Sequence, residues 1–355
     1  MSSEFGDKVK ISIFGQSHSK AIGVVIDGLP AGEKIDMDEL NAFLKRRAPG
    51  SKHATARKEE DMPEFISGLL GDVTCGAPLC AVIQNNDARP GDYEKIRDLP
   101  RPSHADFSAF IKYGGFNDVR GGGHFSGRLT APLCVAGGIA MQILEKKGIA
   151  IGAHIASIGD IHDDMFDAVD LNEEHIKLPG KKEFCAINDE AGQMMIELIQ
   201  RVRQENNSVG GVVECAAVGL PVGIGDPMFD GVENVIAKAV FAIPAVKGLE
   251  FGAGFKSAAG FGDENNDRFY RDGDKIRTKT NNSGGILGGI TNSMPVILRV
   301  AFKPTPSIAR EQDTVNLRTR EDEKLTIEGR HDPCIVVRAV PCVEAAVAIA
   351  LINMI

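Results

Sequence analysis

The chain has 355 residues, of which 43% are hydrophobic and 25% are charged, so its composition excludes wholesale disorder and allows a large buried core. Forty Lys and Arg against 49 Asp and Glu give a net charge of −9, which argues against a nucleic-acid-binding protein because such proteins are more often basic. Glycine is frequent, with 40 residues against a usual share of about 7%, and this indicates glycine loops wrapped around a ligand.

In chain order, the first predicted elements are a strand over Val9–Phe14 and a strand over Val24–Ile26. Asp36 can cap the helix that follows, because Glu39 lies three residues beyond it. The buried face of that helix is an apolar stripe formed by Leu40, Phe43 and Leu44. A longer helix over Thr130–Lys147, closed by Gly148, is apolar on almost every face and is expected to be buried.

The remaining predicted strands cover Ala81–Ile83, Gly211–Glu214 and Pro295–Ala301, and the remaining helices cover Gln193–Arg203 and Val343–Ile355. Strands and helices do not alternate regularly, and no Gly-x-Gly-x-x-Gly motif joins a strand to a helix. We therefore predict an α+β fold rather than a dinucleotide-binding parallel sheet. No linker or charge block divides the chain, so we expect a single domain over residues 1–355.

One short sequence pattern occurs twice in the chain, and we call it the sequence echo. Residues 23–32 read Gly-Val-Val-Ile-Asp-Gly-Leu-Pro-Ala-Gly, and residues 211–223 run from Gly-Val-Val to Gly-Leu-Pro-Val-Gly. Each string is followed by a helical pattern. The two strings are compatible either with chance, because Gly-Leu-Pro-x-Gly is a common end of a strand, or with a duplicated core.

The seven cysteines form no Cys-x-x-Cys pair and mostly lie in apolar runs, which is typical of buried free thiols in a reducing cytosol. We therefore expect no metal site. The N-terminus carries charges where a signal peptide needs an apolar segment. The longest apolar stretch, Ala345–Ile355, is well short of the roughly 20 residues that span a membrane. The sequence predicts a cytoplasmic protein without a membrane segment.

Two histidines lie in loops. His18 directly follows the first strand, where a lone histidine is more often structural than catalytic. His104 belongs to Arg-Pro-Ser-His-Ala-Asp over residues 101–106, and Asp106 can orient its ring if the backbone turns. His104 and Asp106 together indicate a site for acid–base chemistry.

The loop over residues 118–130 is the most informative segment. Its three consecutive glycines, Gly121–Gly123, let the backbone approach a ligand closely. It then enters the N-terminus of the predicted buried helix, and Arg120 and Arg128 flank it. Glycines, guanidiniums and a helix N-terminus together predict an anion-binding site, although the Gly-Lys-[Ser/Thr] ending of a P-loop is absent.

Two further regions are rich in polar groups. Residues 45–58 hold six Lys and Arg beside His53, which fits either a solvated helix end or a set of cations above a polyanionic pocket. Residues 281–290 combine side-chain amides with paired glycines, a pattern that suits a flat heterocycle against the backbone. Four residues that suit a phosphate follow, namely Lys303, Thr305, Ser307 and Arg330.

The ordered set of these motifs resembles the chorismate synthase family over nearly the whole chain. The motifs are Gly-Gln-Ser-His (15–18), Arg-Arg-Ala-Pro-Gly (46–50), Arg-Pro-Ser-His-Ala-Asp (101–106), Lys-Tyr-Gly (112–114), Arg-Gly-Gly-Gly (120–123), Asn-Asn-Ser-Gly-Gly-Ile-Leu-Gly-Gly-Ile (281–290), Phe-Lys-Pro-Thr (302–305) and Gly-Arg-His-Asp-Pro-Cys (329–334). The order of the set is far more specific than any one member.

The resemblance implies an α+β sandwich with helices between antiparallel sheets, assembled as a homotetramer. It implies a carbon–oxygen lyase that converts 5-enolpyruvylshikimate 3-phosphate to chorismate and phosphate by a 1,4-elimination. The reaction needs reduced FMN without net redox change, and NADPH serves only as a source of reducing equivalents. The implied partner is thus a small molecule, with neither nucleic acid nor membrane.

The resemblance also assigns roles to residues. The two catalytic histidines fall on His18 and His104. The FMN-binding positions fall on His124, Phe125, Ser126, Glu264, Asn265, Gly288, Lys303, Pro304, Thr305, Pro306, Ser307 and Arg330. Positions linked to NADPH fall on Arg47 and His53. Our candidates for contacts to the substrate anions are Arg47, Arg120, Arg128 and Arg338.

The chain departs from the family pattern at several of these positions. Gln16, Ser19, Ser103 and His53 replace usual residues, and the glycine cradle continues through His124 to Leu129 instead of the usual Arg-Ser-Ser-Ala-Arg-Glu. Asn353 aligns with an Asp that is thought to help deprotonate the flavin, and an amide cannot take that proton. These differences leave a second hypothesis, a flavin- and anion-binding paralogue with reduced or lost turnover.

Overall fold

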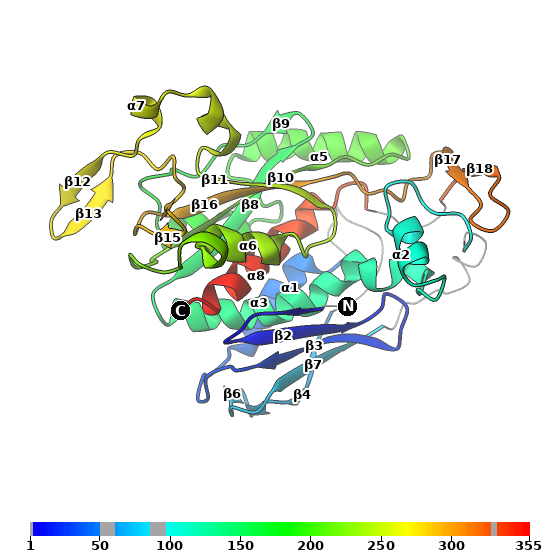
Figure 1. Cartoon of the computed structure of the whole chain (residues 1–355), viewed down its shortest axis with the longest axis horizontal. Helices are drawn as coiled ribbons and strands as arrows, with labels where there is room; N and C mark the ends of the chain where they lie inside the picture. Colours follow the sequence, from blue (N-terminus) through cyan, green and yellow to red (C-terminus); the bar gives the residue numbers. More distant parts are fainter. Residues whose placement is uncertain (1–2, 50–60, 86–96, 328–331) are drawn as a thin grey trace.

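The computed structural model describes residues 3–49, 61–85, 97–327 and 332–355. Two five-stranded antiparallel sheets enclose a layer of helices (Figure 1). In spatial order, the first sheet contains β1 (Glu4–Phe5), β2 (Lys10–Gly15), β3 (Ala21–Asp27), β7 (Leu79–Gln84) and β4 (Glu64–Ser67). The second contains β11 (Val246–Phe251), β16 (Val296–Phe302), β10 (Gly211–Val218), β8 (Ala150–Ile158) and β9 (Ile161–His162). The predicted α+β sandwich is confirmed.

Two helices, α3 (Thr130–Glu145) and α8 (Val336–Ile352), lie between the sheets. Helix α3 packs on β3 and β7, and α8 packs on β8 and β10. Helices α1 (Met37–Arg47) and α6 (Val232–Val240) pack beside them, and α5 (Asp189–Gln204) covers β8 and β9. One cluster of buried apolar side chains links both sheets through the central helices.

The close packing of α3 on α8 follows from their sequences. Both helices are apolar around nearly their whole circumference, so almost every residue is buried. Gly137 has no side chain at the point of closest approach, where a Cβ atom would lie 2.2 Å from the Cβ of Ala345. The glycine therefore allows the two backbones to approach each other directly.

Local signals predicted the starts of α1 and α3 correctly, whereas α5 begins at Asp189, before the predicted start at Gln193. Asp36 caps α1 by accepting a hydrogen bond from the backbone N–H of Glu39 at 3.0 Å. Helix α8 begins at Val336, before the predicted start at Val343, because burial of nearly the whole helix outweighs the hydrogen bond that Pro341 removes.

The two halves of the sandwich have the same topology. The elements β2, β3, α1, β4, β7 and α3 correspond in chain order to β8, β10, α6, β11, β16 and α8. The sheet order is equivalent too, β2-β3-β7-β4 in one half and β8-β10-β16-β11 in the other. The two echoed strings lie on β3 and β10, the middle strands of the two sheets. This shared order favours duplication over chance as the origin of the echo.

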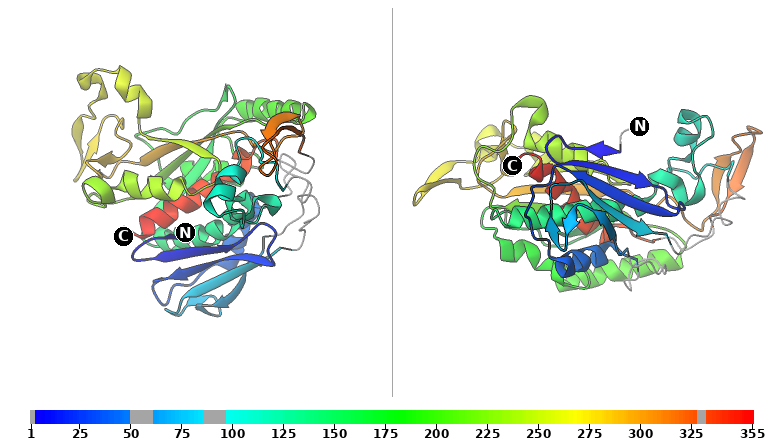
Figure 2. Two further views of the ribbon diagram at one scale, coloured as in Figure 1. Left: turned by 45° about the vertical axis from the view of Figure 1, so that its right-hand side comes forward. Right: turned by 90° about the horizontal axis from the view of Figure 1, so that it is seen from below.

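Smaller elements extend from both ends of this core (Figures 1 and 2). One end carries α7 (Gly262–Asn265) and the hairpin of β12 (Phe269–Asp272) and β13 (Lys275–Thr278). The other end carries α2 (Asp106–Lys112) and the hairpin of β17 (Gln312–Val315) and β18 (Asp322–Leu325). The remaining short elements are β5 (Leu69–Leu70), β6 (Val73–Thr74), β14 (Ile286–Leu287), β15 (Ile290–Thr291) and α4 (Glu173–Lys177).

Within the described residues, one helical stretch is long and apolar enough to cross a membrane by composition alone. It spans Gly127–Glu145, and 89% of its apolar window is buried inside the structure. Its apolar surface is therefore explained by contacts with the two sheets and with α8.

Candidate active site

A cavity of about 550 Å³ lies where the N-terminal ends of α3 and α8 meet. Its described wall contains six cations and a single carboxylate, Asp332. The cations are Arg47, Arg101, Arg128, Lys247, Lys303 and Arg338. They come from segments scattered over most of the chain, so the fold concentrates positive charge in one place although the chain as a whole carries −9.

Two helix N-termini add to this positive potential. Thr130 is the first residue of α3 and Ile335 is the N-cap of α8, and both line the cavity. The first N–H groups of a helix lack intrahelical partners and carry partial positive charge. The duplicated topology brings two such ends together, which makes the cavity suited to a multiply charged anion.

Arg47 and Arg128 are held in this wall by one buried carboxylate. Asp61 forms ion pairs with both guanidiniums, and all three side chains are almost completely buried. Burial alone would raise the pKa of Asp61, but the two arginines outweigh it and lower the pKa. Arg47 is further fixed because it donates to the hydroxyl of Thr130 at 3.0 Å and to the carbonyl of Gly127 at 3.1 Å. The cation-rich helix end predicted from residues 45–58 thus turns inward at Arg47.

Arg338 joins the same cluster from α8. Its Nη1 donates to Asp332 at 2.7 Å and its Nε donates to the carbonyl of Arg47 at 2.9 Å. Burial lowers the pKa of Arg338, Asp332 opposes this effect, and Arg47 adds to it. Three arginines thus share two carboxylates, Asp61 and Asp332, and the remaining positive charge favours a bound anion.

His104 is oriented by a carboxylate, as its spacing predicted. The backbone turns at Ser103, which has a φ of 59°, and His104 Nδ1 lies 2.6 Å from Asp106 Oδ1. Burial alone would raise the pKa of Asp106, but hydrogen bonds from Arg101 and His104 hold it well below its usual value. Because the ionised Asp106 only accepts, Nδ1 carries the hydrogen and Nε2 remains for the cavity.

The glycine loop lies against both candidate catalytic histidines. A Cβ atom on Gly121 would lie 2.4 Å from Cε1 of His18, and one on Gly122 would lie 3.0 Å from Nε2 of His104. Both glycines have positive φ, 59° and 90°, so the loop follows a path that other residues rarely adopt. His104 lines the described wall of the cavity, whereas His18 does not, although His18 is adjacent to Gly121, which does.

Several residues assigned to cofactor binding line the same cavity. They are His124, Phe125, Ser126, Lys303, Thr305, Pro306 and Ser307. The ring of His124 is also hydrogen-bonded, to the carbonyl of Gly15 at 2.7 Å and to the hydroxyl of Ser3 at 2.7 Å. The hydroxyl of Thr305 is buried without a hydrogen-bond partner in the described part of the chain, so it is available to a ligand.

Other predicted site residues lie elsewhere. Arg120 does not line the cavity, because a two-point ion pair holds its guanidinium on Asp118.

Three residues assigned to FMN are also absent from the described wall of the cavity, namely Glu264, Asn265 and Gly288. The first two belong to α7, at the opposite end of the molecule from α2 (Figure 1). Pro304 is adjacent to the wall in sequence but is not part of it. His53 and Arg330 lie outside the described residues.

Asn353, which replaces the usual Asp of the family, does not lie at the cavity. Its side chain accepts hydrogen bonds from the backbone N–H groups of Asp7, Lys8 and Val9 at 2.9–3.1 Å, and it does not line the cavity. The carboxylate that does line the cavity is Asp332, in the Gly-Arg-His-Asp-Pro-Cys motif. Asn353 therefore lies outside the described wall of the cavity, where it fixes the backbone of residues 7–9.

Sequence reasoning gave no role to Asp61, Arg101, Lys247 or Asp332. Arg101 and Asp332 lie inside motifs that carried the resemblance, so the motifs themselves were the available signal. Asp61 and Lys247 belong to no motif, and only the folded chain shows that Asp61 lies between two arginines.

Comparisons with known proteins agree with this geometry. The chain matches the family model described as chorismate synthase over residues 9–355. It is 48% identical to the chorismate synthase of Lancefieldella parvula, over 99% of this chain and 96% of that protein. It is equally 48% identical to the chorismate synthase of Pyrococcus abyssi, over 98% and 95%. A crystal structure of a chorismate synthase superimposes with a TM-score of 0.77 at 26% identity, covering 98% of this chain and 92% of that one.

Proposed function

The chain belongs to the chorismate synthase family, and we propose that it converts 5-enolpyruvylshikimate 3-phosphate to chorismate and inorganic phosphate by a 1,4-elimination. As such it is a carbon–oxygen lyase of aromatic amino acid biosynthesis. Its substrate is a small molecule with two carboxylates and a phosphate.

The observation that carries this proposal is the gathering of cations around one cavity. A multiply anionic substrate needs several charge-assisted hydrogen bonds, each worth about 1.5–3 kcal/mol. Arg47 and Arg128 are buried in the cavity wall, Arg338 is half-buried there, and two helix N-termini point at the same space. Micromolar affinity corresponds to about −8 kcal/mol, so three or four such contacts suffice.

The cavity also fits a flavin. Its volume of about 550 Å³ falls in the usual range of roughly 300–1,000 Å³ for cofactor and ligand sites. Apolar wall residues such as Phe125, Ile243 and Phe302 suit a flat ring, and the buried Thr305 hydroxyl has no partner among the described residues. We assign reduced FMN to this cavity, where it would supply electron density to the allylic C–O bond without net oxidation. Lys303, Thr305 and Ser307 are the residues that would hold its phosphate.

The chain's own residues provide proton transfer and charge stabilisation. His104, fixed by Asp106 and doubly protonated, donates the proton on Nε2 to the departing phosphate. His18, next to Gly121 of the glycine loop, is the second acid. Arg47, Arg128 and Arg338 stabilise the negative charge that develops on the leaving group. Asp332 is the carboxylate of the described wall that can accept a proton.

Further properties belong to the same proposal. We assign the enzyme to the cytoplasm as a homotetramer, with NADPH acting only as a source of reducing equivalents. Its overall charge of −9 disfavours binding to nucleic acid. The paralogue without turnover has no support from the site, because Asn353 lies away from the cavity and Asp332 lines it.

An anaerobic assay tests the proposal. The protein is mixed with 5-enolpyruvylshikimate 3-phosphate and chemically reduced FMN, and chorismate and phosphate are measured together. We expect the two products in equal amounts, with the flavin still reduced at the end. Binding of substrate and flavin without release of phosphate would show that the assignment is wrong.

A further inference from the structure

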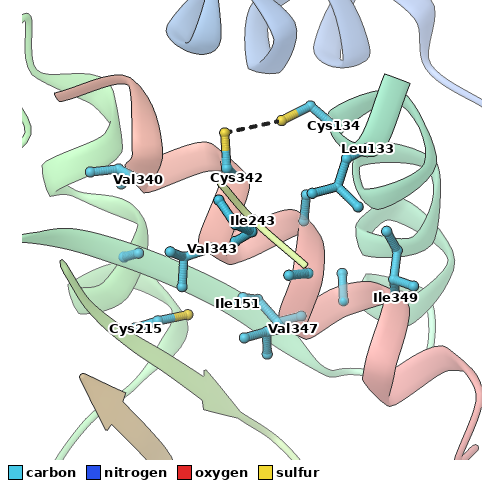
Figure 3. Close-up of a cluster of buried hydrophobic side chains, with 14 of the residues drawn as sticks. Leu133, Cys134, Ile151, Cys215, Ile243, Val340, Cys342, Val343, Val347 and Ile349 are labelled. Atoms are coloured by element: carbon cyan, nitrogen blue, oxygen red, sulfur yellow. Dashed lines mark hydrogen bonds between the residues drawn. The ribbon is translucent and has the colours of Figure 1, made fainter. Parts of the chain in front are cut away.

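Two buried cysteines lie side by side where the central helices cross, and the reaction above uses neither. Cys134 on α3 and Cys342 on α8 have their sulfur atoms 3.9 Å apart, and Figure 3 shows the two side chains directed toward each other. We propose that Cys342 and Cys134 form a redox-modification site, in which peroxide oxidises Cys342 from the cavity and Cys134 then closes a disulfide between α3 and α8.

The helix geometry supports closure of this bond. A disulfide needs two Cα atoms within about 4.4–6.8 Å. One turn beyond the cysteines, Gly137 and Ala345 approach so closely that a Cβ on Gly137 would lie 2.2 Å from the Cβ of Ala345. The two helices are therefore in direct contact beside the thiols, and closing the bond requires the sulfur atoms to move from 3.9 Å to about 2.0 Å apart.

Access and charge single out Cys342 as the first thiol to react. Cys342 lines the active-site cavity, although only 2% of its surface is exposed, whereas Cys134 is completely buried and does not line it. The hydrogen bond from the Cys134 thiol lowers the pKa of Cys342, burial opposes this effect, and Arg47 and Arg338 add to the lowering. Burial raises the pKa of Cys134. A thiolate that a small oxidant can reach, next to a second thiol, is the usual arrangement of a redox-sensitive cysteine.

The chemistry balances with a hydroperoxide as the oxidant. The Cys342 thiolate attacks one peroxide oxygen, the O–O bond breaks, and Cys342 becomes a sulfenic acid while the other oxygen leaves as water after protonation. The Cys134 sulfur then attacks the Cys342 sulfur, and the S–O bond breaks to release a second water. Two thiols and one hydrogen peroxide thus give one disulfide and two waters, with two electrons passing from sulfur to oxygen.

The other buried cysteines lack the combination of a lowered pKa and a neighbouring thiol. Burial raises the pKa of Cys185 and of Cys334 to about 12, and it raises that of Cys215 well above its usual value. Among the described contacts, Cys134 and Cys342 form the one thiol–thiol pair. Cys75 is exposed and Cys80 is half-buried, so both can react with peroxide on their own and must be removed before thiols are counted.

The experiment uses the full chain carrying Cys75→Ser and Cys80→Ser, which leaves five of the seven cysteines. The protein is treated with hydrogen peroxide, free thiols are counted in denaturant, and tryptic peptides are analysed by mass spectrometry. We expect the thiol count to fall to three, with a cross-link between the peptides of Cys134 and Cys342 that dithiothreitol removes. The readout is independent of turnover, so it does not depend on the proposed function.

A second protein with the additional change Cys134→Ala controls for the mechanism, and Cys215→Ala is the matched control at another buried cysteine. In Cys134→Ala we expect no cross-link and instead a sulfenic acid on Cys342 that dimedone traps, whereas Cys215→Ala cross-links as its parent does. Peroxide that leaves Cys342 unmodified in both the parent and Cys134→Ala, or a cross-link through any other cysteine, would overturn the proposal.

Discussion

The proton donor of the site is defined by three side chains at the start of α2. Asp106 accepts from Nδ1 of His104 and from two nitrogens of the Arg101 side chain, at 2.6–2.8 Å. Arg101 thereby keeps the carboxylate ionised, and the carboxylate fixes the tautomer of the ring. The imidazole presents Nε2 toward the glycine loop and the cavity.

Replacing His104 tests this role. We expect His104→Ala to lower kcat by about 10²–10⁴, the usual contribution of a positioned general acid, with little change in KM because the cations remain in place. The matched control is His175→Ala, which removes an exposed histidine of α4. Steady-state kinetics under anaerobic conditions give both constants. A His104→Ala enzyme as fast as the control would remove His104 from the mechanism.

At this scale the sequence indicated some residues of the cavity wall and missed others, for a physical reason. His104, Arg47 and Arg128 lie inside strings whose order matched a family, and the structure brings them to one cavity. Glu264 and Asn265 lie between matched strings, so no nearby motif supported their assignment, and they lie on α7, outside the described wall of the cavity. Asp61 could not be predicted because its role exists only once the fold places it between two arginines.

The elements that create the site are α3 and α8, and their contact depends on one small residue. Gly137 lies where a side chain would overlap Ala345. The helices could be predicted from their apolar character, but their mutual contact could not, because composition gives no partner for a helix that is apolar on all faces.

We predict that Gly137→Ala destabilises the protein by about 1–3 kcal/mol through overpacking, although alanine favours helices. The control is Gly262→Ala, at a helical glycine where an added Cβ would meet nothing within 4 Å. Unfolding in urea measures both free energies. A Gly137→Ala protein as stable as the control would show that α3 and α8 are less tightly packed than the structure indicates.

The second sheet contains a buried charged cluster. His154 on β8 lies 3.1 Å from Asp163 and 3.0 Å from Glu214, and all three side chains are inaccessible to solvent or nearly so. Burial alone would lower the pKa of His154, but hydrogen bonds to the two carboxylates outweigh it and raise the pKa. Its contribution to stability is therefore complete below the unfolded value of about 6.5 and is lost as pH rises through the folded value.

Nuclear magnetic resonance of the His154 ring measures this directly. We expect the ring to titrate above the value of about 6.5 of a free histidine, and the melting temperature to fall by roughly 2–4 °C for each kcal/mol lost as the ring deprotonates. A ring that titrates below the value of a free histidine would contradict the assignment.

At the scale of the whole molecule, the fold separates charge. The chain carries −9 overall, yet the described wall of the cavity holds six cations and one carboxylate. Arg47 and Arg338 are 291 residues apart in sequence but share a hydrogen bond. Such a local positive field inside an acidic protein attracts anionic substrates while the outer surface repels polyanions.

The duplicated topology explains why the positive charge is concentrated at one place. Each half ends in a central helix, α3 or α8, and both helices begin at the cavity. The sequence echo of β3 and β10 was compatible with duplication or with chance, and it did not show that two helix N-termini meet, since that depends on how the halves pack.

Binding of the substrate to two arginine variants tests the account most directly. The affinity for 5-enolpyruvylshikimate 3-phosphate is measured by titration calorimetry for the wild type, for Arg338→Gln in the cavity, and for Arg271→Gln, an exposed arginine on β12. Loss of one charge-assisted contact corresponds to about 10- to 100-fold weaker binding, and we expect it for Arg338→Gln alone, with its melting temperature recorded as a check on folding. Equal affinity in all three proteins, with Arg338→Gln folded, would contradict the claim that the gathered cations bind the substrate.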